Sequence, residues 1–328
     1  MPWKGEKNPY RIWLSEIILQ QTRVQQGLAY YNKFITTYPT IAHLASAPET
    51  DVFKMWEGLG YYRRCRNMLD TAKHIVEEKD GIFPFEFEEI KALQGVGPYT
   101  AAAIASFAFD LPHAVLDGNV FRVLARFFGI DVSIDTLAGK KYFTSLANDL
   151  LDKTKPGVYN QAIMDFGAVI CKPLPDCMVC PLKERCVAYQ NNTIGLYPVK
   201  EKKKDKTLRW FYYIVAEYDE GFYIRQRQEK DIWQNLHEFY LLESKQEMQE
   251  DEVALHVKQV FENACILDVS KSYSQHLTHQ TIKGRFFHIR LSQLKSLQGF
   301  NYLKKEDLQK IAFPRYITTY FQDSRILN

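Results

Sequence analysis

The sequence of 328 residues has no long apolar run, and no apolar segment at its start. A helix that spans a bilayer needs about 20 consecutive apolar residues, so the sequence argues against a membrane protein and a membrane partner. The opening residues, Met1 to Glu6, also lack the apolar stretch of a secretory signal. We therefore expect a cytoplasmic protein, because a chain without an address stays there by default.

The sequence also has little excess charge, with a formal net charge of +3. Residues 1–190 carry 21 basic and 21 acidic residues, so their balance is zero. This argues against a protein that binds nucleic acid through a large net positive charge. Any contact with DNA in this region must come from local patches of charge.

Cysteine is scarce but clustered. Of six cysteines, four lie within 16 residues in the spacing C-x5-C-x2-C-x5-C, namely Cys171, Cys177, Cys180 and Cys186. In a chain without a secretion signal such a cluster indicates a metal or iron-sulfur site before it indicates disulfides. Four thiolates can bind zinc or a [4Fe-4S] cluster, and the spacing alone leaves both open.

Two regions differ in their patterning. Residues 1–190 have helical periodicity, for example over 12–34, interrupted by glycine and proline turns. Residues 191–207 include a charged stretch that is typical of a solvated linker. Residues 208–328 have strand-like runs around a helical segment at 247–261. We expect an all-α domain followed by an α+β domain.

Glu16 is the first candidate for acid-base chemistry. On a helix three of its four stacked neighbours are apolar, namely Ile12, Trp13 and Leu19. An apolar pocket raises the pKa of a carboxyl group, which suits a general acid near neutral pH. From spacing alone, a glutamate on the flank of an amphipathic helix is the simpler interpretation. Gln20 and Gln21 follow with two amides that can read base edges or fill the gap left by an extruded base, or simply end a helix.

Residues 93–101 join two helical segments through a glycine-rich turn. Gly95 and Gly97 allow a tight turn, and Pro98 fits the first turn of the next helix. The exposed amides at that helix start form an anion site that suits a DNA phosphate.

Asp117 is the second candidate carboxylate. It follows an apolar run and precedes a helical segment, where the helix N-terminus and free amides keep a carboxylate ionised. A helix cap explains the same position, and capping and catalysis are compatible. Cleavage of a glycosidic bond requires two carboxyls in contrasting surroundings, and Glu16 with Asp117 meet that requirement.

These motifs, in this order, resemble the helix-hairpin-helix DNA glycosylase superfamily. Residues 13–16, 19–22 and 58–62 are similar to its MutY-type adenine glycosylase branch. The resemblance implies an all-α helix-hairpin-helix glycosylase domain over 1–190 with an iron-sulfur loop at 171–186. It further implies a linker over 191–207 and a MutT-like (Nudix-like) α+β domain over 208–328.

The resemblance also implies roles for the central residues. Glu16 protonates the flipped adenine at N7, and Asp117 stabilises the sugar cation or forms a transient adduct with it. Asn119 orients Asp117. Tyr99 supports this step and stands where endonuclease III-type relatives carry a lysine nucleophile, which implies base removal without efficient strand cleavage.

Further residues are implied in substrate contacts. Trp3 and Gln161 match positions of the adenine pocket, and Tyr61 matches an aromatic residue wedged into the duplex, with Gln21 filling the stack. Arg63 belongs to an aromatic-basic stretch that suits contacts with phosphates and bases, although exposed helix arginines are common.

The same resemblance favours a [4Fe-4S] cluster over zinc, with a first cysteine gap one residue shorter than usual. In the second domain, Thr278 and His279 match a reader of 8-oxoguanine. The glutamates of the Nudix hydrolysis box are missing, so pyrophosphatase activity is not expected.

The implied function is removal of adenine mispaired with 8-oxoguanine or guanine in double-stranded DNA, by a monofunctional glycosylase of base excision repair. We expect a monomer acting on bacterial chromosomal DNA. Two alternatives remain: a bifunctional endonuclease III-like glycosylase/lyase, and a non-catalytic protein that binds DNA lesions.

Overall fold

The computed structural model describes residues 4–201, 205–324 and 326. The chain forms two compact units. The first comprises Met1–Ser46 with Asn67–Lys203, and the second comprises Ala47–Arg66 with Lys204–Asn328. The boundaries at residues 190 and 208 that we inferred from the sequence stay a prediction.

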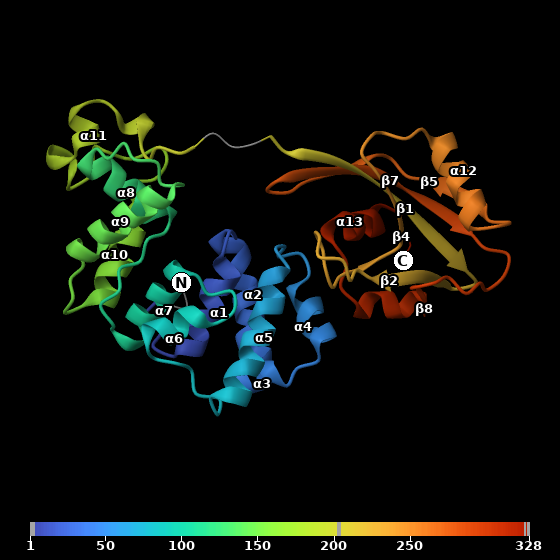
Figure 1. Ribbon diagram of the computed structural model, residues 1–328, viewed down its shortest axis with the longest axis horizontal. Helices are drawn as coiled ribbons and strands as arrows, with labels where there is room; N and C mark the ends of the chain where they lie inside the picture. Colours follow the sequence, from blue (N-terminus) through green and yellow to red (C-terminus); the bar gives the residue numbers. More distant parts are fainter. Residues whose placement is uncertain (1–3, 202–204, 325, 327–328) are drawn as a thin grey trace. The chain divides into compact units, whose positions relative to one another are not determined.

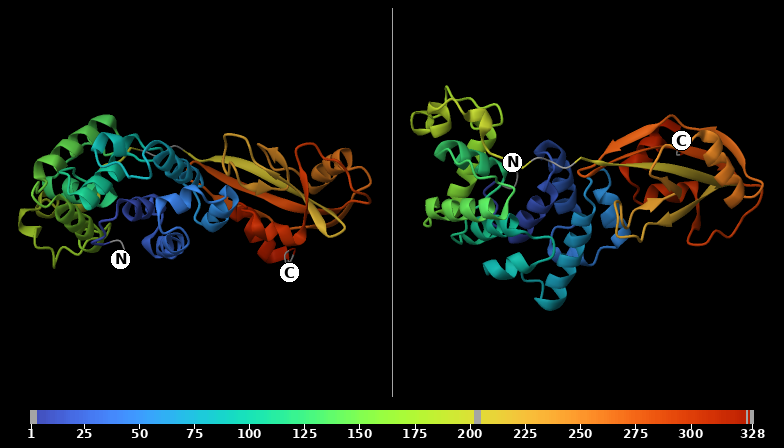
Figure 2. Two further views of the ribbon diagram at one scale, coloured as in Figure 1. Left: turned by 90° about the horizontal axis from the view of Figure 1, so that it is seen from below. Right: turned by 45° about the horizontal axis from the view of Figure 1, so that its top comes forward.

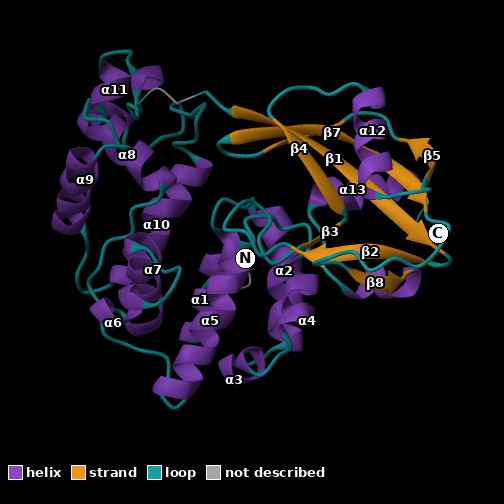
Figure 3. Cartoon of the chain, turned by 45° about the vertical axis from the view of Figure 1, so that its right-hand side comes forward, coloured by secondary structure: helices purple, strands orange, loops and turns teal. Residues whose placement is uncertain are grey.

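The first unit is built from helices and loops in its described part (Figures 1 and 3). Its α-helices are α1 (Pro9–Leu19), α2 (Val24–Thr37), α3 (Ile41–Ala45), α5 (Arg63–Glu78, which begins in the second unit), α6 (Phe87–Ala92), α7 (Pro98–Phe109), α8 (Gly118–Phe128), α9 (Leu137–Leu150), α10 (Pro156–Val169) and α11 (Val187–Gln190). Two 3-10 turns, η1 (Lys183–Arg185) and η2 (Ile194–Leu196), flank α11.

Helix α1 is the central element of this unit. Asn8 caps it by accepting from the backbone N–H groups of residues 10 and 11, and Pro9 fits its first position. Its residues Trp13, Leu14 and Ile18 are fully buried. It packs on α7, whose buried run 101–105 consists of four alanines and one isoleucine, and the alanines allow the two backbones to approach closely.

The helical periodicity over 12–34 is broken in the structure. Helix α1 ends at Leu19 and α2 begins at Val24, with Gln21 in the left-handed region at φ 54°. The polar residues of this turn, Gln20 to Thr22, end the apolar stripe, so the single long segment that periodicity indicated is two helices.

Helix α10 is tied to its neighbours by Asn160, which is buried. Its Nδ2 donates to Ser106 Oγ at 2.9 Å and to His113 O at 2.8 Å, and its Oδ1 accepts from Val115 N at 3.1 Å. These bonds join α10 to α7 and to the segment that leads to Asp117. One amide side chain thus fixes three parts of the chain around the later site.

The second unit contains all the strands of the described chain, in an eight-stranded mixed sheet. They are β1 (Thr207–Tyr218), β2 (Gly221–Gln226), β3 (His237–Glu238), β4 (Tyr240–Ser244), β5 (Cys265–Val269), β6 (Tyr273–His276), β7 (Gln280–Arg290) and β8 (Asn301–Lys304). The main order is β3-β2-β1-β7-β5, with β4 paired to β1, β6 to β7 and β8 to β2. Strands β1 and β7 run parallel, and the other pairs are antiparallel.

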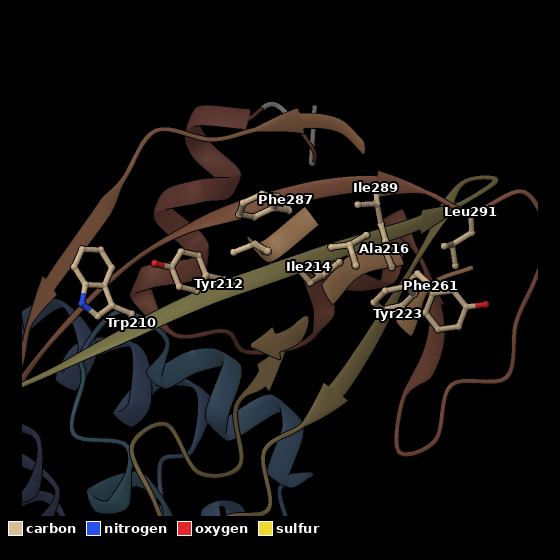
Figure 4. Packing of buried hydrophobic residues seen from close by; sticks show 11 residues of the cluster. Trp210, Tyr212, Ile214, Ala216, Tyr223, Phe261, Phe287, Ile289 and Leu291 are labelled. Carbon is tan, nitrogen blue, oxygen red and sulfur yellow. The ribbon is translucent and has the colours of Figure 1, made fainter. Parts of the chain in front are cut away.

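Two helices, α12 (Glu250–Val260) and α13 (Arg315–Ser324), cover opposite faces of this sheet (Figure 2). Side chains of a strand alternate between faces, so Tyr212 and Ile214 of β1 join the core cluster beneath α12 (Figure 4). On the other face Tyr213 and Phe286 pack with the aromatic rings of α13, and the rings of Phe286 and Tyr320 are stacked at 4.0 Å. The unit also includes α4 (Glu49–Trp56) and the 3-10 turn η3 (Lys305–Lys310).

Within the described residues, no helix combines the length and the apolar character that crossing a membrane requires.

We predict that Asn160→Ala lowers the free energy of unfolding by about 3 kcal/mol, because it leaves a buried N–H and a buried carbonyl without partners. Urea unfolding followed by helical circular dichroism measures this change. Asn32→Ala, in an exposed position of α2, is the matched control and should have little effect. Equal effects of the two substitutions would contradict the role given to Asn160.

Candidate active site

A cavity of about 980 Å³ opens in the first unit. Its walls come from the N-terminal segment, α1, α7, the start of α8 and α10. Seven of the residues predicted as functional line it together: Glu16, Gln20, Gln21, Tyr99, Asp117, Asn119 and Gln161. Trp3, the other predicted pocket residue, lies outside the described residues.

Glu16 lies on the buried face of α1 with 7% of its surface exposed. The pKa of this carboxyl is raised to about 7, mainly by burial; a hydrogen bond from Tyr99 lowers the pKa in part, and the nearby charge of Asp117 adds to the rise. At neutral pH a large fraction of the group is therefore protonated, as a general acid must be.

Tyr99 is the second residue of α7, directly after Pro98. Burial raises the pKa of its hydroxyl well above the ordinary value, and the charges of Glu16 and Asp117 act in the same direction. The phenol stays neutral and its hydroxyl donates a hydrogen bond to the Glu16 carboxyl. Tyr99 therefore contacts the Glu16 carboxyl, and as a phenol it cannot act as an amine nucleophile.

Asp117 caps the N-terminus of α8 and has a polar environment. Its Oδ1 accepts from the backbone N–H groups of Asn119 at 2.9 Å and Val120 at 2.8 Å. Its Oδ2 accepts from Asn119 Nδ2 at 2.7 Å. These three donors, together with the helix dipole, stabilise the charged form. The cavity thus holds one carboxyl that burial favours as neutral and one that donors favour as charged.

Asn119 is held in turn by Arg122, a residue that the sequence analysis missed. Arg122 Nη2 donates to Asn119 Oδ1 at 2.9 Å and to Gly167 O at 2.7 Å, and its Nε donates to Cys171 O at 2.7 Å. The spacing of three residues from Asn119 was the available signal, because such pairs are neighbours on a helix. The network connects the site to the start of the cysteine loop.

The cavity mouth carries two ion pairs that were also missed. Lys4 Nζ lies 2.6 Å from Asp165 Oδ2, and Lys7 Nζ lies 2.8 Å from Asp110 Oδ2. Asp165 Oδ1 accepts from Gln161 Nε2 at 3.0 Å. The pairs tie the N-terminal segment to α10 and to the end of α7, and sequence separation of more than 100 residues hides such pairing from pattern analysis.

In the glycine-rich turn before α7, one of the two glycines has a backbone conformation that favours glycine. Gly95 has φ 80°, and a Cβ there would meet Asn67 Cβ at 2.8 Å. Gly97 has ordinary extended backbone, so the tight turn expected from the sequence does not depend on it. Nothing lies within 4 Å of where its Cβ would stand, so the space beside it is open. Gln20 Nε2 donates to Gly95 O and to Thr100 Oγ1, each at 3.3 Å, and so braces the turn.

All six cysteines are free thiols. Two of them contact Arg126. Arg126 Nη1 donates to Cys171 Sγ at 3.6 Å, and Cys186 Sγ donates to the Arg126 carbonyl at 3.4 Å. Burial raises the pKa of Cys177, and the other three thiols of the loop raise it further, so the four sulfurs share one neighbourhood. Among the described residues, no three or more His, Cys, Asp or Glu side chains lie close enough together to coordinate a metal ion. The four thiols form a donor set of the type that suits a [4Fe-4S] cluster or zinc.

In the second unit, two predicted DNA-contact residues meet. Tyr61, with φ 48° and 47% of its surface exposed, lies with its hydroxyl 2.8 Å from Thr278 Oγ1 in the loop between β6 and β7. His279 and Arg63 are exposed and their predicted contacts stay predictions. Arg64, which is buried, lies over the Tyr61 ring at 5.5 Å and stabilises its position.

The two parts of the chain match two known domain families. The family model of the HhH-GPD superfamily of base excision DNA repair proteins matches residues 14–147, and the NUDIX domain model matches residues 211–323. A thermostable thymine-DNA glycosylase of known structure is 29% identical, with a TM-score of 0.54 over 58% of this chain and 88% of that one. An endonuclease III–DNA complex, 22% identical with a TM-score of 0.50, covers 57% of this chain and 86% of that one and shares the fold.

Fold and site therefore define a base excision DNA glycosylase with a helical HhH-GPD domain and a Nudix-like domain. Among curated relatives, the adenine DNA glycosylase of Buchnera aphidicola subsp. Baizongia pistaciae is 40% identical over 244 residues, which cover 72% of this chain and 67% of the relative. The adenine DNA glycosylase of Mus musculus is 40% identical over 200 residues, covering 58% and 39%. The chain belongs to the adenine DNA glycosylase family, and it hydrolyses the N-glycosidic bond of adenine in DNA in base excision repair. The expected family, fold class and enzyme class are confirmed.

The raised pKa of Glu16 has a consequence for stability. The folded protein holds the proton more tightly than the unfolded chain, so the stability from this group is present at low pH and is lost as pH rises through about 7. We predict that Glu16→Gln stabilises the protein, and that its advantage grows by about 3 kcal/mol between about pH 4.5 and about pH 8.5.

Urea unfolding at the two pH values measures this difference. Glu77→Gln, which removes an exposed carboxylate of α5, is the control and should show no such growth. An advantage of Glu16→Gln that is independent of pH would show that Glu16 is not held protonated by burial.

Proposed function

We propose that the chain is a monofunctional adenine glycosylase, active as a monomer, that removes adenine opposite 8-oxoguanine or guanine in double-stranded DNA. The observation that carries the proposal is the contrast between Glu16 and Asp117 within one cavity: the first is buried with a pKa of about 7, and the second accepts three hydrogen bonds at a helix N-terminus. Glycosidic hydrolysis uses such a pair.

In this mechanism an adenine flipped out of the duplex enters the cavity. The Glu16 carboxyl donates its proton to N7 of the base, which makes the base a better leaving group as the bond to C1′ breaks. The Asp117 carboxylate faces the positive charge that develops on the sugar, and stabilises it or bonds to C1′ until water attacks. Asn119 orients Asp117, and the neutral Tyr99 hydroxyl donates a hydrogen bond to the Glu16 carboxyl.

Strand cleavage needs an amine that attacks C1′, and the cavity has no unpaired one among its described residues. Tyr99 is a phenol, and the lysines of the lining, Lys4 and Lys7, are held in ion pairs with Asp165 and Asp110. A protonated, paired amine is a poor nucleophile. Both the phenol at position 99 and the pairing of the two cavity lysines therefore argue against the bifunctional alternative.

The DNA contacts follow from the same arrangement. The amides at the start of α7, beside the open space at Gly97, suit a backbone phosphate. Gln21 of the cavity is proposed to fill the base stack, and Tyr61 of the second unit is separately proposed to wedge into the duplex. Thr278 and His279 are proposed to read the opposite 8-oxoguanine. The hydrogen bond between Tyr61 and Thr278 supports a shared role, because it places the proposed wedge and the proposed reader together.

The cysteines Cys171, Cys177, Cys180 and Cys186 are proposed to hold a [4Fe-4S] cluster, with zinc as the alternative. The bound group would hold the loop in one conformation. Arg122 and Arg126 both bond to the backbone of this loop, and Arg122 also bonds to Asn119. No step at Glu16 or Asp117 requires the group.

We predict that Glu16→Gln and Asp117→Asn each slow the release of adenine from an adenine:8-oxoguanine duplex by at least about 100-fold, because each removes one of the two acid-base or electrostatic contributions. Single-turnover assays with alkali treatment measure this rate. Glu77→Gln and Asp149→Asn, at exposed positions on α5 and α9, are the matched controls and should keep the wild-type rate.

The same assay decides between the alternatives. Wild-type rates in both active-site variants would overturn the mechanism, and duplex binding without base release would favour a non-catalytic protein. Strand breaks without alkali, together with borohydride trapping of the enzyme on DNA, would favour a glycosylase/lyase.

We predict that protein purified without oxygen is brown and contains about four iron and four sulfide per chain, because four thiolates complete one [4Fe-4S] cluster. Metal analysis and the visible spectrum measure this. Cys177→Ser should lose the colour, whereas Cys265→Ser, outside the loop, should keep it. A colourless protein with one zinc per chain would contradict the cluster.

A further inference from the structure

Three side chains at the cavity mouth form one connected set: Lys4, Gln161 and Asp165. Gln161 and Asp165 lie one turn apart on α10, and all three residues line the cavity that holds Glu16. Asp165 Oδ1 accepts from Gln161 Nε2 at 3.0 Å, while Asp165 Oδ2 lies 2.6 Å from Lys4 Nζ. The carboxylate therefore has a separate partner on each oxygen.

The chemistry of this contact fixes the orientation of the Gln161 amide. The oxygen and nitrogen of an amide have nearly the same shape, so packing alone does not choose between them. An ionised carboxylate only accepts hydrogen bonds, so the amide nitrogen must face Asp165. The ion pair with Lys4 holds the Asp165 carboxylate in this acceptor role. The amide oxygen is then turned away from Asp165, and in the described part of the chain it has no hydrogen-bond donor.

We propose that Asp165 is a positioning residue that presents the Gln161 carbonyl oxygen to the extruded base and so selects purines with an amino group at C6. This inference rests on the proposed function, in which the base enters this cavity. Adenine donates from its 6-amino group to that oxygen. A 6-oxo purine such as hypoxanthine would place oxygen against oxygen, and leaving such a pair unsatisfied costs about tenfold to hundredfold in relative rate.

Hypoxanthine isolates this contact. It keeps the purine ring and the N7 atom that Glu16 protonates, and it differs from adenine mainly at position 6. The ratio of the two release rates therefore reports the orientation of Gln161, while a general loss of structure or of acid catalysis lowers both rates together.

The test measures single-turnover release of adenine and of hypoxanthine, each opposite 8-oxoguanine, for the full chain. Asp165→Asn replaces the acceptor with an amide that donates as well as accepts, so Gln161 can adopt both orientations. We expect the adenine:hypoxanthine ratio to fall about tenfold. The control is Asp110→Asn, which breaks the other ion pair of the mouth, to Lys7, without contacting Gln161, and it should keep the wild-type ratio.

A second pair of variants tests whether Asp165 acts through Gln161. In a Gln161→Met background there is no amide to orient, so adding Asp165→Asn should leave the ratio unchanged. An Asp165→Asn ratio equal to wild type would overturn the proposal, and so would the same fall in the ratio when Asp165→Asn is added to the Gln161→Met background. If the wild-type chain releases no adenine, the proposed function fails as well. If it releases adenine and only the ratio is insensitive to Asp165→Asn, the positioning role alone fails.

Discussion

Burial of the Glu16 carboxyl is the constraint on which the rest of the site depends. Helix α1 carries it on the face that packs against α7, and the loss of water there raises its pKa to about 7. This burial lowers the stability of the fold as pH rises through about 7, because the ionised carboxyl favours water. The surrounding structure holds the group in place, and the buried residues of α1 and the small residues of α7 provide that support.

Asp117 is the complement of this constraint. It accepts hydrogen bonds from two backbone N–H groups and one side-chain amide. The same cavity therefore surrounds one carboxyl with hydrogen-bond donors and buries the other. Asn160 joins α10 and α7 to the segment before Asp117, and Arg122 joins Asn119 to the cysteine loop. The contrast between the two carboxyls is thus produced by tertiary contacts and by one helix end together.

Much of the site was predictable from the sequence, because its main residues sit in local motifs. The apolar neighbours of Glu16 indicated burial, and the position of Asp117 before a helix indicated a cap; both features exist in the structure. The order of the motifs then implied one cavity, and Glu16, Tyr99, Asp117 and Gln161 do share one. What local pattern could not supply was pairing across the chain: nothing in the sequence joins Lys4 to Asp165. Periodicity also missed the break after Leu19, since apolar residues resume at helical spacing in α2 and only the polar Gln20 to Thr22 mark the turn.

The pH dependence of adenine release under single-turnover conditions tests the central claim most directly. If Glu16 is the acid, with a pKa of about 7 set by burial, the rate is nearly constant below about pH 6 and falls about tenfold per pH unit above about pH 7.5. The residual rate of Glu16→Gln should lack this inflection. A wild-type rate that stays flat or rises from about pH 7 to about pH 9 would contradict the account, because an ionised Glu16 has no proton to donate.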